Sequence, residues 1–294
     1  MMVEIKNKNT LPPLVSIACI TYNHSQFIKQ CLDSILMQKI NFTFEIVIHD
    51  DASTDGTREI IEEYATRYPN IIFPMYQTEN QFSKGVRGIN PRFNYNRCRG
   101  NYIALCDGDD YWTDENKLQK QIDFLQANDE YSMCCHDALV KPYYGKDFIY
   151  NDYKSDFDFE FERLIYQNRI PTASIVYRKF YIDPKFFNGI MAGDWLLNLL
   201  NAERGKIRYF NSVMSVYRVH TNSIWSGMEG NDIILKGVTV MDKLNRHFKY
   251  KYDSIFKDAI RKRMEKYSYS KNKKGYLWNM RKKIIFQIKR KLTF

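Results

Sequence analysis

The sequence predicts an α/β fold, in which a mixed and mostly parallel sheet is flanked by helices and followed by a helical C-terminal extension. Short apolar, β-branched runs alternate with helical patterns through the first half of the chain, which is typical of a sheet covered on both faces. Polar and acidic residues directly follow several of these runs. Beyond residue 230 the pattern is helical and increasingly basic.

The first predicted strand is Leu14–Ile20, because a continuous apolar run indicates a buried strand. A helix is predicted over Ser25–Gln38, where apolar residues recur on one side. The next predicted elements are strand Phe44–Ile48, helix Thr57–Tyr68, strand Ile71–Tyr76, helix Asn90–Cys98, strand Tyr102–Cys106 and helix Lys117–Ala127. Between about 132 and 219 the pattern is weaker, and it predicts strands Ala173–Tyr177 and Val213–Tyr217 and a helix over Asp194–Ala202.

The composition favours one large domain with an appendage, since the chain has 294 residues and 44% hydrophobic content. No run approaches the roughly 18 apolar residues that cross a bilayer, and the polar N-terminus lacks a signal-peptide core. We therefore expect a cytoplasmic protein. The six cysteines show no CxxC spacing, so we expect buried free thiols.

The positive charge is concentrated at the C-terminal end. Residues 243–294 contain 18 Lys and Arg against 3 Asp and Glu, a net of +15, whereas the whole chain has +10. We expect an N-terminal extension over 1–12, an α/β domain over 13–228 and a basic helical region over 229–294. The amphipathic segment Tyr276–Phe294 would either lie on an anionic membrane surface or pack on the α/β domain. No recognised nucleic-acid motif is present, so we expect no nucleic-acid partner.

Polar residues follow three of the predicted strands, and acidic residues are among them after two. Parallel strands present their carboxyl ends at one edge, where such sheets bind ligands. Five carboxylates would crowd that edge, and their repulsion calls for a cation or hydrogen-bond donors. The segments are Thr21–Asn23 after the first strand, His49–Asp51 after the second and Asp107–Asp110 after the fourth.

The segment Asp107–Asp110 predicts a divalent-cation site. Hard oxygen ligands on a tight turn suit Mg²⁺ or Mn²⁺, which takes substrate phosphates as further ligands. Gly108 would let the backbone turn sharply and leave room for a ligand. The alternative is that these acids only cap a turn, and Asp50-Asp51 has a similar alternative as an Asx-turn.

Three segments resemble glycosyltransferase family 2: VSIACITYNH (15–24), EIVIHDDASTDGT (45–57) and GNYIALCDGDDYW (100–112). The resemblance covers residues 13–225 and implies the GT-A fold, which is Rossmann-like. It also implies an inverting transfer of a sugar from a nucleotide-sugar donor, usually UDP-linked, to a glycan or lipid-linked acceptor in bacterial surface polysaccharide biosynthesis. A lipid-linked acceptor would fit a peripheral position on the inner face of the plasma membrane.

The resemblance also implies roles residue by residue. Asp194 matches the general base, although many members have Glu-Asp where this chain has Gly193-Asp194. Another departure is the stretch 91–94 (PRFN), where many members have Ala-Arg-Asn. For nucleotide-sugar binding the resemblance implies Thr21, Tyr22, Asn23, Asp51, Asp107 and Arg92. For the cation, Mn²⁺ or Mg²⁺, it implies Asp109, Asp107 and His220.

Other interpretations stay open from the sequence. Asp194 could cap a helix as well as act as a base, and His220 could be a packing histidine. A sugar nucleotidyltransferase also places acids and metal on an α/β sheet, although the first strand here lacks the Gly-rich loop of that class. A non-catalytic module that binds nucleotide sugars is a further alternative.

Overall fold

The computed structural model describes residues 12–221 and 230–271. The chain divides into two compact units, residues 1–226 and 227–294. The domain boundary predicted between 228 and 229 stays a prediction. In the part of the chain that the structure describes, no helix is both long enough and apolar enough to cross a bilayer.

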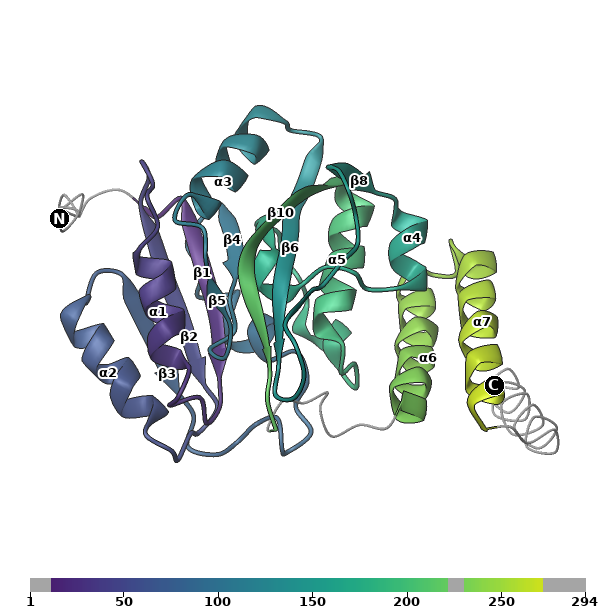
Figure 1. Cartoon of the computed structure of the whole chain (residues 1–294), viewed down its shortest axis with the longest axis horizontal. Helices are drawn as coiled ribbons and strands as arrows, with labels where there is room; N and C mark the ends of the chain where they lie inside the picture. The colour runs from purple at the N-terminus through teal and green to yellow at the C-terminus, as the bar shows by residue number, and fades with distance from the viewer. Residues whose placement is uncertain (1–11, 222–229, 272–294) are drawn as a thin grey trace. The chain divides into compact units, whose positions relative to one another are not determined.

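The first unit is built on one mixed, mostly parallel sheet, as the sequence predicted (Figure 1). Its strand order is β3-β2-β1-β4-β9-β6-β10-β5, with β7 paired to β6 and β8 paired to β10. Strands β1 to β4 are parallel, β6 is parallel to β10, and β9 runs antiparallel between β4 and β6. The strands are β1 Val15–Thr21, β2 Phe44–Asp50, β3 Ile72–Tyr76, β4 Tyr102–Leu105, β5 Tyr111–Trp112, β6 Tyr131–Pro142, β7 Phe148–Ile149, β8 Phe157–Phe159, β9 Val176–Arg178 and β10 Lys206–Val219.

Helices cover the sheet because each buries an apolar side against it. Alternate residues of β1 pack with the apolar faces of α1 and α3 in one core cluster. The burial of these side chains contributes roughly 25 cal/mol per Å² of apolar surface removed from water. The helices of this unit are α1 Ile28–Leu36, α2 Thr57–Arg67, η1 Asn90–Asn94, α3 Lys117–Ala127, α4 Phe161–Tyr166, η2 Thr172–Ser174, η3 Pro184–Phe187 and α5 Gly193–Arg204.

Several predicted elements differ from those observed. The helix predicted from Ser25 begins at Ile28, and the one predicted over Asn90–Cys98 is a short π-helix that ends at Asn94. Strand β6 was missed because both of its faces are buried, so its sequence shows neither alternation nor a pure apolar run. The predicted strand Val213–Tyr217 is only the end of the 14-residue β10.

The second unit contains α6, Gly230–His247, and α7, Asp253–Lys271. The connection includes Lys249 and Tyr250, which both have positive φ, and the Asn245 side chain donates to the Asp253 carboxylate at 2.9 Å. The segment Tyr276–Phe294 and the N-terminal residues 1–11 lie outside the described residues, so the predictions made for them stay predictions.

Candidate active site

Two acidic segments meet around the carboxyl end of β1. Strand β1 lies between β2 and β4, so the residues after these three strands share one edge of the sheet. The Asp51 N–H donates to the Thr21 carbonyl oxygen at 3.0 Å, and the Gly108 N–H donates to the Ile20 carbonyl oxygen at 2.9 Å. Asp51 and the turn that contains Gly108 therefore flank the end of β1 from two sides.

The turn after β4 is closed by the Asp110 N–H, which donates to the Asp107 carbonyl oxygen at 3.0 Å. A Cβ atom on Gly108 would lie 2.8 Å from the Thr21 hydroxyl oxygen and 3.1 Å from Nδ1 of His24. Gly108 does not have a positive φ. From the sequence, this glycine was expected to permit a sharp turn and to leave room for a ligand. In the structure, the turn needs no positive φ, and a side chain at this position would clash with Thr21 and His24.

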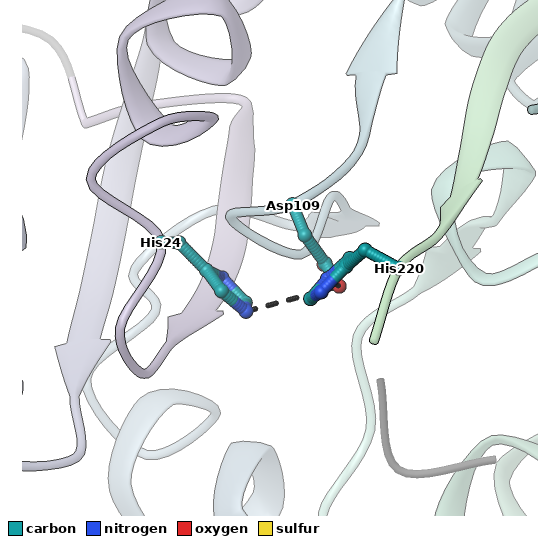
Figure 2. Close-up of side chains that lie close together, drawn as sticks. All are labelled: His24, Asp109 and His220. Atoms are coloured by element: carbon teal, nitrogen blue, oxygen red, sulfur yellow. Dashed lines mark hydrogen bonds and ion pairs between the residues drawn. The ribbon is translucent and has the colours of Figure 1, made fainter. Parts of the chain in front are cut away.

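Asp109 points toward two histidines that come from distant parts of the chain (Figure 2). Its Oδ2 lies 3.1 Å from Nε2 of His220, which directly follows β10, and 3.8 Å from Nε2 of His24, which follows β1. One ligand atom from each of these residues lies within 4.8 Å of the others. A carboxylate and two imidazoles in this arrangement can hold a divalent cation.

The acids of the turn differ in protonation. Burial by itself would raise the pKa of Asp109, but the hydrogen bond from His220 brings it below its ordinary value, so this carboxylate is ionised. Burial, together with the charge of Asp109, raises the pKa of Asp107 and of Asp110 well above the usual range. Oδ1 of Asp107 is buried and has no hydrogen-bond partner in the described residues. A cation bound here would offset this repulsion, so the donor set fits Mg²⁺ or Mn²⁺.

Arg218, which lies in β10, holds the acidic turn in place. It was not among the residues predicted from the sequence. Its backbone N–H donates to Oδ1 of Asp110 at 2.9 Å, and its guanidinium donates to the Asp109 carbonyl oxygen at 2.7 Å. The guanidinium also lies 4.4 Å from the centre of the Tyr111 ring. The only signal was its place two residues before His220 in the segment YRVH. Its partners, which lie more than 100 residues earlier, become visible only in the folded chain.

Asp194 lies in the first turn of α5, which begins at Gly193, so it is not the residue before the helix. The Asn168 side-chain amide donates to its Oδ2 at 2.6 Å, and the Asn198 amide in turn donates to Asn168 at 2.9 Å. Burial raises the pKa of Asp194. The charge of Asp194 also contributes to the raised pKa of Asp107, which places this carboxylate near the acidic turn.

Asp51 organises the loop that follows β3. Its two carboxylate oxygens accept from the backbone N–H groups of Gln81, at 2.8 Å, and Phe82, at 3.0 Å. Its side chain is buried. Each oxygen keeps acceptor capacity for a further donor, such as the N–H of a nucleotide base. The neighbouring Thr21 hydroxyl is buried and has no hydrogen-bond partner in the described residues.

The remaining predicted residues differ in their availability. Tyr22 is 44% exposed beside the end of β1. Asn23 adopts a positive φ, and its side-chain oxygen accepts from the Thr54 N–H, so it shapes the loop. Arg92 donates to the Arg87 carbonyl oxygen and to the Asn188 side chain. The nucleotide-binding roles expected for these three residues stay predictions.

Asp50 matches the Asx-turn alternative that was raised from the sequence. It is buried at the end of β2 and accepts from the backbone N–H and the hydroxyl of Ser53. Burial raises its pKa. Asp50 therefore stabilises the loop before α2.

A mixed, mostly parallel sheet flanked by helices, with an acidic turn after β4 and histidines beside it, is the arrangement of the GT-A fold of glycosyltransferases. The chain belongs to glycosyl transferase family 2, whose family model matches residues 16–179. This confirms the fold and the family that the three sequence segments indicated.

Several known proteins are similar to this chain. The chain is 36% identical over 225 residues to an uncharacterised protein of Mycobacterium tuberculosis, covering 72% of this chain but only 60% of that relative. It is 28% identical over 213 residues to the Escherichia coli UDP-Glc:alpha-D-GlcNAc-diphosphoundecaprenol beta-1,3-glucosyltransferase WfaP, covering 72% of this chain and 79% of WfaP. The crystal structure of Staphylococcus aureus TarS with UDP-GlcNAc matches with a TM-score of 0.58 at 18% identity, covering 79% of this chain and 66% of TarS.

Proposed function

We propose that the protein is an inverting glycosyltransferase of bacterial surface polysaccharide synthesis. It moves a sugar from a UDP-linked donor onto a glycan or lipid-linked acceptor and uses Mn²⁺ or Mg²⁺. The observation that carries this proposal is the gathering of Asp109, His24 and His220 at the end of β1, opposite Asp51. Family membership supports the reaction class.

The nucleotide side of the site is assigned to the end of β1 and its neighbours. Asp51, held by two backbone N–H groups, accepts a hydrogen bond from the base. Thr21, Tyr22 and Asn23 line the nucleoside pocket. Arg92 binds a phosphate of the donor. UDP-Glc in the name of WfaP and UDP-GlcNAc in the TarS complex support a UDP-linked donor.

The diphosphate side is assigned to the acidic turn. Asp109 and His220 would hold the cation, with Asp107 beside them, and a bound cation would supply Lewis-acid neutralisation of the charge on the leaving diphosphate. Nε2 of His220, which is hydrogen-bonded to Asp109 at 3.1 Å, is the atom that would bind the cation. Arg218 keeps the turn in place through both Asp109 and Asp110.

Asp194 acts as the general base. It takes the proton of the acceptor hydroxyl while that oxygen forms a bond to the anomeric carbon and the bond to the diphosphate oxygen breaks, so one displacement inverts the configuration. Burial makes the carboxylate a stronger base than an exposed aspartate. Asn168 and Asn198 orient it and act as positioning residues.

An exposed aromatic hairpin supports a lipid-linked acceptor. Tyr143 and Tyr144 follow β6 and Phe148 begins β7, and these three side chains are between 54% and 84% exposed. Pro142 at the end of β6 pairs with Val219, the residue before His220. Aromatic side chains of this kind favour a membrane interface, and WfaP is named for a diphosphoundecaprenol-linked acceptor. The basic C-terminal segment would add attraction to anionic lipid and keep the enzyme peripheral to the cytoplasmic membrane.

The test is release of UDP from a panel of UDP-sugars in the presence of Mn²⁺ and a diphosphoundecaprenol-linked sugar. We expect release that needs both donor and acceptor and that is lost in Asp194→Asn, with Asp123→Asn on the exposed face of α3 as the matched control. Release of pyrophosphate from UTP and a sugar 1-phosphate would instead identify a nucleotidyltransferase. Tight donor binding without transfer to any acceptor would identify a binding module.

A further inference from the structure

His24 faces the acidic turn although nothing in its sequence context distinguished it. It lies three residues beyond the end of β1, and its Nε2 is directed at Oδ2 of Asp109, 3.8 Å away (Figure 2). Its ring is 5.8 Å from the ring of His220, at an interplanar angle of 90°. Two imidazoles therefore approach the same carboxylate oxygen from different elements of the fold.

The backbone around His24 is held rigidly. Three consecutive N–H groups, those of Asn23, His24 and Ser25, donate at 2.9, 2.8 and 3.0 Å to side-chain oxygens of the loop after β2 and of the first residue of α2. The acceptors are Ser53, Thr57 and Asp55. A ligand on a preorganised backbone binds a cation at a smaller entropic cost than a ligand on a mobile loop.

The space for the His24 ring is also prepared. Nδ1 packs where a side chain on residue 108 would stand, so Gly108 is needed to admit the imidazole. The Phe27 ring meets the His24 ring in an edge arrangement, with centroids 6.3 Å apart.

The spacing of the three ligand atoms suits one ion. Bonds of about 2.1 Å place neighbouring ligand atoms of an octahedral ion about 3.0 Å apart. The observed separations from Asp109 are 3.1 Å and 3.8 Å, and all three ligand atoms lie within 4.8 Å of one another, so the side chains would close around one ion to bind it. Imidazole nitrogen binds borderline transition ions better than it binds Mg²⁺, which prefers oxygen and water.

We propose that His24 is a third protein ligand of the cation, with Asp109 and His220, and that it makes the site prefer Mn²⁺ over Mg²⁺ and hold Mn²⁺ before any nucleotide binds. The inference deepens the proposed function because it concerns the same cation. Its test uses neither donor nor acceptor, so a failure of the glycosyl-transfer proposal would not affect the result.

The first measurement is a Mn²⁺ titration of the full chain without nucleotide, followed by the electron paramagnetic resonance signal of free Mn²⁺. Wild-type protein should bind one Mn²⁺, and His24→Ala should weaken binding by about tenfold or more. His247→Ala, on α6, is the matched control and should bind as wild type does. With Mg²⁺ as competitor, displacement should need a larger excess in wild type than in His24→Ala. Equal affinities in wild type and His24→Ala would overturn the proposal.

The second measurement is decided by wild-type protein, so its outcome does not depend on how well the variant folds. Pulsed electron paramagnetic resonance of Mn²⁺ bound to wild-type protein should detect nitrogen couplings from two imidazoles, and His24→Ala should retain one. A single coupled imidazole in wild type, or no Mn²⁺ binding without nucleotide, would refute His24 as a ligand. Either result would leave a site built from Asp109, His220 and the donor diphosphate intact.

Discussion

Lys117 should make the stability of the first unit depend on pH. It is the first residue of α3 and is completely buried, and its ammonium lies 4.1 Å from the centre of the Trp112 ring. Among the described residues, this ammonium has no hydrogen-bond partner. Burial lowers its pKa from 10.5 to about 7. An attraction to the indole ring is worth about 2 kcal/mol, which is less than the cost of burying the charge.

The magnitude follows from the pKa shift. A pKa lowered from 10.5 to about 7 means that folding disfavours the charged form of Lys117 relative to the neutral form by about 5 kcal/mol. Between pH 7 and 10.5 the unfolded chain holds the proton that the folded Lys117 has released, so the free energy of unfolding rises with pH in this window. The penalty is about 4 kcal/mol at pH 7 and about 2 kcal/mol at pH 9. Replacement by Met keeps the apolar stem and removes the penalty.

The assay compares thermal unfolding of wild type and Lys117→Met at pH 7 and pH 9. The gain in stability should be larger at pH 7 by about 2 kcal/mol, or roughly 5 °C in Tm. Lys120→Met is the matched control, because Lys120 lies on the same helix with an exposed ammonium that pairs with Asp114. Its difference from wild type should not change with pH. A gain for Lys117→Met that is the same at both pH values, or a loss at pH 7, would refute the reasoning.

Three further predictions concern the site. Gly108→Ala should lower the free energy of unfolding by about 1–3 kcal/mol, because its Cβ would overpack against Thr21 and His24, and should weaken Mn²⁺ binding. Thermal unfolding and a Mn²⁺ titration measure the two effects, and unaltered Mn²⁺ binding would contradict the geometry. Asp194→Asn should lower kcat by about 10² to 10⁴ with little change in the Kd of the donor. In wild type, kcat should fall with decreasing pH through the raised pKa of Asp194, and a flat profile would argue against this base. Asp51→Ala leaves two backbone N–H groups unpaired, so it should lower the free energy of unfolding by about 2 kcal/mol and weaken UDP binding. Calorimetry that found UDP binding unchanged would exclude a nucleotide-binding role for Asp51.

Local patterns predicted the elements with pure periodicity. Strands β1 and β2 and helices α2 and α3 appear within one or two residues of their predicted bounds, because one apolar run or one helical face determines each of them. Strands β6 and β10 were harder to predict, since both of β6's faces are covered and β10 contains register shifts against it. Their pairing joins residues about 75 positions apart, which no local window contains.

The sequence by itself determined the family, the mostly parallel sheet and the edge where acids collect, because apolar runs followed by polar residues reveal strand ends. Only the tertiary structure decided which side chains face one another there. His24 and Asp109 are 85 positions apart, and Asp109 and Arg218 are 109 apart, yet β1, β4 and β10 bring them into contact. Contact between distant residues depends on strand order and register, and these are set by packing of the whole chain. The family resemblance already indicated Asp109 and His220 as cation ligands, but the places of His24 and Arg218 beside them could be recognised only in the folded chain.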